Sequence, residues 1–95
     1  MASAVRDNPA RNRYELEVEG SLAFIDYRRA GRIVTLTHAE VPQNLRGGGI
    51  GSALVRGTLE LARSQGDSIV PRCAFVVAYL RRHPEFDDLR ADRRP

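Results

Sequence analysis

A glycine run at the junction of two different hydrophobic patterns constrains this chain more than any other feature. Four of the five residues 47–51 are glycine, with Arg46 before them and Ser52 after them. Upstream, apolar and polar residues alternate, which is typical of strands with one buried face. Downstream, small and apolar residues recur at helical spacing, at Ile50, Ala53, Leu54, Gly57 and Leu61. The sequence therefore predicts a strand that turns into a helix through a glycine-rich loop.

The alternating part of the chain predicts an antiparallel meander. Alternation over residues 13–19 favours a strand, and apolar residues over 21–28 and 32–41 favour two more, with tight turns between them. Pro42 ends the third strand because proline has no N–H to donate to a sheet. Residues 1–12 are polar, contain a proline, and are predicted to be a flexible N-terminus.

The second half of the chain predicts helix, strand, helix. The first helix begins near Ile50 and ends at Gly66, which suits a helix C-cap. A short strand over 68–70 leads to a helix over 74–82, which is apolar on nearly every side and therefore expected to be largely buried. The charged end over 87–95 is expected to fray.

The order of these elements predicts the fold class. The first helix is a crossover between the third and fourth strands, so these strands should be parallel with a right-handed connection. We therefore predict an α+β or α/β domain of order β-β-β-α-β-α with a mixed sheet. The 95 residues suit one domain, over 13–89, with 90–95 as a flexible tail.

Composition narrows the function classes. No apolar run reaches the roughly 20 residues of a membrane span, and residues 1–12 do not resemble a signal peptide, so we expect a cytoplasmic protein. The only cysteine, Cys73, excludes a disulfide framework and a multi-cysteine zinc site, and no metal is expected. Cys73 is either a small buried hydrophobe or a reactive thiol.

The cationic side chains of the chain are all arginine, and the net charge is +3. Arginine suits phosphate ligands, although the bias also fits genome base composition. The arginines are dispersed and the aromatic residues do not interleave with them, so nucleic acid is not an expected partner.

The glycine run itself predicts an anion site. The first amides of a helix lack intrahelical partners, the helix dipole adds positive charge there, and glycine admits a phosphate close to the backbone. A P-loop is excluded because the chain has no lysine. The dinucleotide fingerprint is excluded because Leu54 stands where its third glycine belongs. The alternative is that the glycines only mark a flexible turn.

The loop resembles the R/Q-x-x-G-x-G/A motif of the Gcn5-related N-acetyltransferases, with Arg46, Gly49 and Gly51 at its fixed positions. The stretch from His38 to Ser52 is similar to that of small, single-domain, YjdJ-type acetyltransferase-like proteins. Their second hallmark matches Pro71-Arg72-Cys73-Ala74-Phe75, then Tyr79, then His83-Pro84-Glu85-Phe86. The resemblance covers residues 14–89.

This resemblance implies a minimal acyl-CoA N-acyltransferase fold that binds acetyl-CoA (coenzyme A) where the third and fourth strands diverge. Pantetheine would pair with backbone near Glu40 and Val41. The pyrophosphate would contact the amides of Arg46, Gly47, Gly48, Gly49, Ile50, Gly51 and Ser52. The acceptor would be an unidentified primary amine, and the chain a monomer or weak dimer. Full-size members have extra N-terminal helices that this sequence lacks, so a non-catalytic CoA-binding module is the alternative.

Acetyl transfer to an amine calls for a base and an acid. By position, Tyr79 resembles the tyrosine that can reach the CoA sulfur, although it also suits a core aromatic. His38 and Glu40 are two residues apart on one strand face and are candidates for the base, or else a solvated polar pair. Cys73 precedes a helix, which would favour its thiolate and a covalent acetyl intermediate; direct transfer is the alternative.

The segment His83-Pro84-Glu85-Phe86 follows the second helix. It is interpreted first as structural, with the proline stopping the helix and Phe86 packing back. The alternative is that His83 and Arg82 contact the phosphates of the cofactor.

Overall fold

The structure, a computed structural model that describes residues 4–92, is built on a five-stranded sheet of order β1-β2-β3-β4-β5. The strands are β1 (Arg6–Asn8), β2 (Arg13–Val18), β3 (Ser21–Ala30), β4 (Ile33–Glu40) and β5 (Ser68–Pro71). Strands β1 to β4 pair antiparallel, and β4 pairs parallel with β5. The predicted mixed sheet and its parallel last pair are confirmed.

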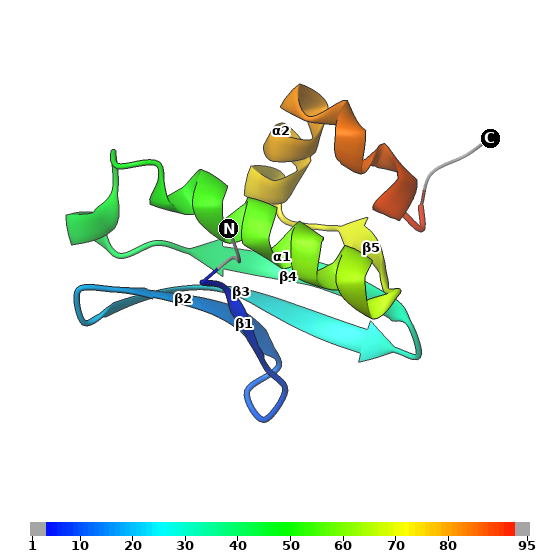
Figure 1. Cartoon of the computed structure of the whole chain (residues 1–95), viewed down its shortest axis with the longest axis horizontal. Coiled ribbons are helices and arrows are strands. Elements are labelled where there is room, and N and C mark those ends of the chain that lie inside the picture. The colour runs from blue at the N-terminus through cyan, green and yellow to red at the C-terminus, as the bar shows by residue number, and fades with distance from the viewer. Residues whose placement is uncertain (1–3, 93–95) are drawn as a thin grey trace.

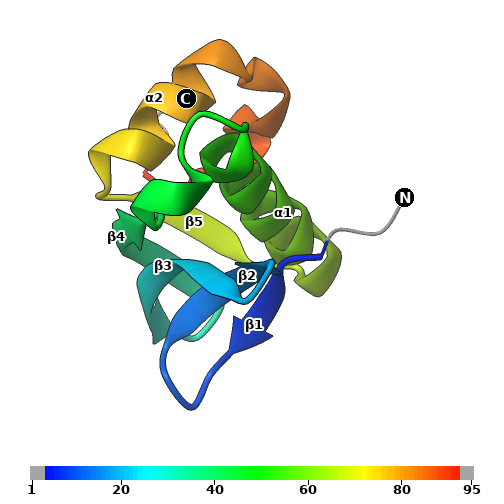
Figure 2. The same cartoon turned by 90° about the vertical axis from the view of Figure 1, so that its left-hand side faces the viewer.

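The helices lie above this sheet in both views (Figures 1 and 2). They are α1 (Ile50–Gln65) and α2 (Ala74–Arg82), with short 3-10 helices η1 (Gln43–Leu45) and η2 (Pro84–Leu89). Gly66 ends α1 in the left-handed conformation with φ 75°, as the sequence predicted. Within residues 4–92, no helix has the length and apolar character that a membrane span requires.

Side chains of the sheet alternate between two faces that differ in burial. The covered face, which packs against the helices, carries fully buried residues such as Tyr14, Ile25 and Leu36. The bare face carries their neighbours in the strands, including Phe24, over whose ring the Arg13 guanidinium lies 4.5 Å from the centroid. Side chains on the bare face are therefore separated from the helices by the sheet itself.

The two ends of the chain are more ordered than the sequence predicted. Residues 6–8, predicted to be flexible, form β1 and pair with β2, while residues 1–3 lie outside the described part. Of the charged end over 87–95, expected to fray, residues 87–89 instead belong to η2, whose Phe86 and Leu89 are buried, while residues 93–95 lie outside the described part. Arg90 then forms an isolated parallel β-bridge with Ile69 of β5. In both places a few buried apolar side chains hold a polar segment in place. The polar composition of the segment alone does not predict this order.

Helix α2 is also less buried than predicted. Val76, Tyr79 and Leu80 form its buried side, but Phe75 is 42% exposed. The prediction took apolar residues on every side of a short helix to mean that every side is buried in the core. The helix lies at the margin of the core, so only one side finds partners.

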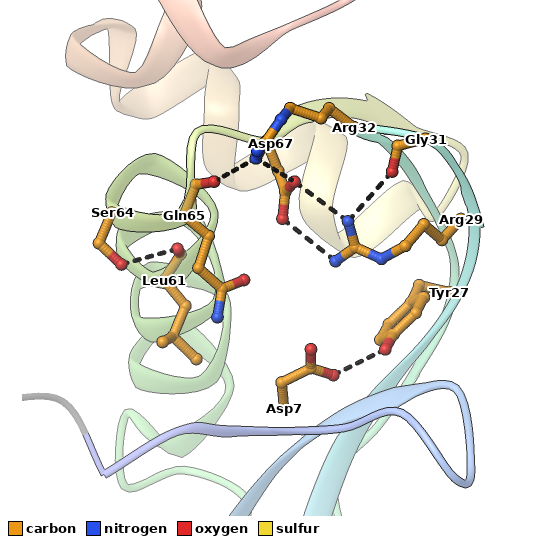
Figure 3. A network of polar contacts seen from close by, with 9 residues as sticks. All are labelled: Asp7, Tyr27, Arg29, Gly31, Arg32, Leu61, Ser64, Gln65 and Asp67. Carbon is orange, nitrogen blue, oxygen red and sulfur yellow. Dashed lines mark hydrogen bonds and ion pairs between the residues drawn. The ribbon is translucent and has the colours of Figure 1, made fainter.

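Polar contacts hold the end of the sheet where β3, β4, α1 and β5 meet (Figure 3). Asp67, only 5% exposed, accepts hydrogen bonds from both Arg29 terminal nitrogens at 3.0 and 3.1 Å. Arg32 donates to the Gln65 carbonyl at 2.7 Å, at the end of α1. The Asp67 hydrogen bond raises the pKa of Arg29. We call Arg29, Arg32, Gln65 and Asp67 the polar clamp.

Candidate functional site

A β-bulge in β4 decides which side chains face the helices near the glycine loop. Tyr27 pairs with Leu36, but the preceding residue Asp26 pairs with His38, so Thr37 is the extra residue. A single inserted residue reverses the alternation beyond it. Ala39 consequently takes the covered face, opposite buried Ile25.

Strands β4 and β5 separate at the same place. Their pairing ends with Leu36 beside Pro71, followed by a hydrogen bond of 2.9 Å from the Arg72 amide to the Leu36 carbonyl. Past this bond β4 continues to Glu40, whereas the other chain segment passes through Cys73 into α2. The two segments diverge from a narrow end at Cys73, and β4 beyond Leu36 has no strand partner there among residues 4–92.

The glycine loop brings free amides to the wide end of this divergence. Gly47 and Gly49 have φ of 87° and 77°, and Gly49 is the N-cap of α1. The first intrahelical bond runs from Ala53 to Gly49, which leaves the amides of residues 50–52 without that partner. Among the described residues no side chain caps α1, and its first turn carries no acidic residue. The loop therefore presents donors and a positive dipole end to an anion.

A cavity of about 420 Å³ lies between the loop, β4 and α2. Its lining joins the loop to apolar side chains and comprises Ala39, Val41, Arg46, Gly47, Gly49, Ile50, Gly51, Ser52 and Phe75. Every residue of the predicted cofactor set except Gly48 is in this lining. The two additions have clear origins: Ala39 faces the cavity because of the bulge, and Phe75 belonged to the second motif without being assigned a role.

Arg46 folds back onto the strand it follows. Its Nε donates to the Val41 carbonyl at 3.0 Å. The arginine therefore fixes the end of β4 against the loop, while the rest of its guanidinium stays exposed at the cavity. This backbone oxygen is one of the groups to which the sequence assigned pantetheine.

His38 and Glu40 share a strand face, as predicted, but it is the bare face. His38 pairs with Asp26 and Glu40 pairs with Phe24. The side chains of His38 and Glu40 are 60% and 59% exposed. His38 Nε2 lies 3.3 Å from Glu40 Oε2. Counting by twos from Leu36 places both residues on the cavity side, and the bulge at Thr37 reverses that. The pair borders the divergence of β4 from the side opposite the cavity.

Cys73 is the N-cap of α2 and is half-buried against the core. It lies at the narrow end of the divergence but is not part of the cavity lining. The sequence prediction that Cys73 immediately precedes a helix is confirmed.

Tyr79 lies between α1 and η2, away from the cavity lining. It is 2% exposed, its ring stacks on His83 with centroids 4.0 Å apart, and its hydroxyl accepts a hydrogen bond from Arg56 at 3.5 Å. That hydrogen bond raises the pKa of Arg56. The structure therefore gives Tyr79 the partners of a core aromatic.

The segment after α2 packs as a structural element. Pro84 begins η2, and Phe86 is buried beneath Arg56 and Arg63, whose guanidinium carbons lie 5.4 and 5.3 Å from its ring centroid. Glu85 pairs with His83 at 3.4 Å. Neither His83 nor Arg82 lines the cavity. Within residues 4–92 no group of three or more His, Cys, Asp or Glu is placed to hold a metal.

Comparison with known proteins bears on this arrangement. A sequence profile described as GCN5-related N-acetyl-transferase matches residues 13–89. The chain belongs to the GCN5-related N-acetyltransferase family. Its match is to the small YjdJ-type domain of that family.

A solved structure agrees with the fold of this GCN5-related domain. The solution structure of a GCN5-like protein from Staphylococcus aureus, with a proposed N-acetyltransferase activity, superposes with a TM-score of 0.69. The two sequences are 23% identical, and the match covers 99% of this chain and 94% of the other. At this identity the likeness concerns the fold, and it extends over nearly the whole chain.

Proposed function

We propose that this chain is an acetyl-CoA-dependent N-acetyltransferase that moves acetyl to a primary amine. The observation that carries the proposal is the cavity, in which uncapped amides of α1 meet apolar walls from β4 and α2. A phosphate group suits the amides, and a long arm of low polarity suits the walls. Coenzyme A combines these two parts in one molecule, and family membership supports the same ligand.

The residues present fit this cofactor at both parts. A Cβ added at Gly47 or Gly49 would meet no atom within 4 Å, so both glycines face open space where a phosphate can approach. Beyond Leu36 the edge of β4 offers backbone groups without a strand partner, which suits the amides of pantetheine. Bound acetyl-CoA would supply an activated acetyl thioester.

The chemistry requires a neutral amine and a stabilised leaving thiolate. We assign His38 and Glu40 to removal of the amine proton, with the acceptor approaching from the bare face of the sheet. Both side chains are exposed to about 60%, so an amine can reach them from solvent. Tyr79 remains the candidate acid by its position in the family motif, and because its hydroxyl accepts from Arg56, its own proton is free to be donated.

Cys73 provides a second route. Its thiolate would attack the thioester carbon, break the bond to the CoA sulfur and form an acetyl-cysteine, while the released CoA thiolate takes up a proton. The amine would then attack this new thioester and restore the Cys73 thiol. In direct transfer the amine attacks acetyl-CoA itself, and Cys73 only packs.

The test measures thiol release when the protein is incubated with acetyl-CoA and a panel of amines, peptides and polyamines. We expect turnover with at least one acceptor. The variants His38→Ala and Glu40→Gln should lower kcat by about 100-fold or more, the usual contribution of a general base, while the Kd for CoA stays within about twofold. Isothermal titration calorimetry supplies that Kd. Absence of thiol release above background across the panel contradicts the enzymatic proposal.

Cys73→Ser separates the two routes. If the acetyl group passes through the thiol, this variant loses turnover and intact-protein mass spectrometry of the wild type shows a single added acetyl group that Cys73→Ser lacks. If transfer is direct, Cys73→Ser retains most activity. Tyr79→Phe, which keeps the buried ring, tests the acid without disturbing the core.

A non-catalytic CoA-binding module is the second candidate. It is favoured by one observation: β1 to β4 follow one another through turns, without helices between them, so helices of that kind form no acceptor pocket among residues 4–92. This alternative predicts CoA binding without turnover, and function that is insensitive to Cys73→Ala and Tyr79→Phe.

A further inference from the structure

One carboxylate on the bare face of the sheet lacks the partner that its position offers. Asp26 of β3 pairs in register with Arg13 of β2, so the two side chains stand opposite each other on the same face. Opposite charges at such cross-strand positions attract each other. Arg13 instead donates to Glu15 at 2.7 Å, and its guanidinium lies 4.5 Å from the centroid of the Phe24 ring. Asp26 is therefore left without this cation.

The burial of Glu15 explains where Arg13 goes. The Glu15 side chain is only 4% exposed, and it also accepts a hydrogen bond from Asn8 at 3.0 Å. A buried carboxylate needs such partners more than an accessible one does. Asp26 is only partly buried, and within residues 4–92 no arginine or histidine forms an ion pair with it. The charge of Asp26 is thus available to a ligand.

Asp26 also stands next to the candidate base. On its other side it pairs in register with His38 of β4, and Phe24 pairs with Glu40. The Phe24 and His38 rings have their centroids 6.5 Å apart on this face. Neighbouring strands are about 4.8 Å apart, so a chain of about four carbons that starts at His38 and crosses the strands reaches Asp26.

We propose that Asp26 determines which acceptors the protein prefers, because it binds a second ammonium group about four carbons from the amine that reacts at His38. This inference rests on the proposed function, since it assumes that His38 and Glu40 take the proton of that amine. The preferred substrate class is therefore the short aliphatic diamines. An acceptor with a carboxylate at its far end would meet a like charge at Asp26 and would be disfavoured.

The experiment compares three acceptors of similar length that differ in the charge at the far end. Butane-1,4-diamine carries an ammonium there, butylamine carries no charge, and 4-aminobutanoate carries a carboxylate. Rates of thiol release from acetyl-CoA give kcat and KM for each acceptor, with the value for the diamine divided between its two equivalent amines.

Three variants of the full chain are measured with each acceptor. Asp26→Asn removes the charge with little change in shape, and Asp26→Glu retains the charge. Glu17→Gln is the matched control, because it removes an exposed carboxylate from the same face at a different place, opposite Leu22. Circular dichroism confirms that each variant is folded.

We expect wild type to use the diamine with a kcat/KM about tenfold above that for butylamine, the lower end of what a hydrogen bond to a charged group contributes. The value for 4-aminobutanoate should lie below that for butylamine. Asp26→Asn should lose most of the preference through a higher KM for the diamine, while kcat and the rates with butylamine stay within about twofold. Asp26→Glu should retain part of the preference, and Glu17→Gln all of it.

Three results overturn the inference while leaving the proposed function intact. In the first, wild type acetylates amines but does not prefer the diamine among these three. In the second, Asp26→Asn keeps the full preference, so other groups determine it. In the third, Asp26→Asn and Glu17→Gln lose the preference equally, which would indicate net charge rather than a specific contact. Absence of thiol release with every amine would instead overturn the proposed function, and the inference with it.

Discussion

The two ends of the β4–β5 pair are built in opposite ways. At one end the strands are hydrogen-bonded and the polar clamp joins β3, the end of α1 and the start of β5. At the other end the strands diverge, α1 begins with uncapped amides, and glycines and apolar side chains line a cavity. The same two strands and the same helix contribute to both ends.

The difference separates stability from binding. At the clamped end the buried Asp67 carboxylate is paired with Arg29. A charge can be buried at low cost only when it has such a partner within the chain. At the open end backbone donors remain without intrachain partners, so a ligand can supply them. A domain of this size has a small core. Because the buried ion pair and the hydrogen bonds of the clamp stabilise one end, the other end can keep an open site.

The largest expected effect is at the clamp. Asp67→Ala leaves Arg29 without its bidentate partner, and we expect a loss of about 2–3 kcal/mol, below the range for fully buried pairs because Arg29 is partly exposed. For a domain of this length that corresponds to a fall of about 10–20 °C in Tm. Thermal and chemical denaturation measure it.

Arg32→Ala is the matched control within the same clamp. Arg32 is 75% exposed and lies 4.0 Å from Asp67, so its removal should cost under about 0.5 kcal/mol from that ion pair, with a further small loss from its bond to Gln65. If both variants lose the same stability, the clamp is not organised around buried Asp67, and the proposed contrast between the two ends fails.

A smaller stability effect, combined with a binding effect, is expected at the open end. Gly49→Ala places a side chain on a residue with φ 77°, which costs about 1 kcal/mol, and its Cβ projects into open space near the free amides. We expect coenzyme A affinity to fall about tenfold, the equivalent of about 1.4 kcal/mol. Calorimetry with coenzyme A and thermal denaturation measure the two effects.

Gly48→Ala serves as the control in the same loop. Gly48 has no positive φ, and an added Cβ would stand 3.9 Å from the Leu45 carbonyl, an ordinary contact. Stability and affinity should both remain close to wild type. Equal losses in the two variants would mean that any side chain in the loop is harmful, rather than one placed at the start of α1.

Much of the fold was predictable because local patterns and long-range packing agree. Alternation around Leu16, the crossover helix and the Gly66 cap predict the mixed sheet that the structure contains. Strand β1 was missed because its three residues are all polar and too few to carry a periodic signal, and their order comes from pairing with β2. The clamp was missed because Arg29 and Asp67 are 38 residues apart and meet only in the folded chain.

The candidate site was predictable as far as a local motif determines its geometry. The glycine loop defines a helix start by itself, so residues 46–52 were found, and all but Gly48 line the cavity. The surrounding side chains depend on a feature without a sequence signature, the bulge at Thr37. One inserted residue moves His38 and Glu40 to the bare face and brings Ala39 to the cavity.

The smallest expected effect concerns that bulge, which marks the boundary between the two ends. Thr37 is exposed, and its Oγ1 donates to the Asp26 carbonyl at 3.2 Å. If the hydroxyl only accompanies the bulge, Thr37→Ala should cost about 0.5 kcal/mol, the usual net value of an exposed hydrogen bond. The register should persist because a shift would expose Ala39 and Val41 and bury His38, and burying an unpaired polar group is the costlier arrangement.

Nuclear Overhauser effects between the backbones of β3 and β4 test this directly. Wild type and Thr37→Ala should both show Ile25 opposite Ala39, with chemical denaturation giving the small loss of stability. A variant in which His38 moves opposite Ile25 would show that the hydroxyl itself maintains the bulge. In that case the identity of residue 37, rather than the apolar pattern of the covered face, would determine which side chains reach the cavity.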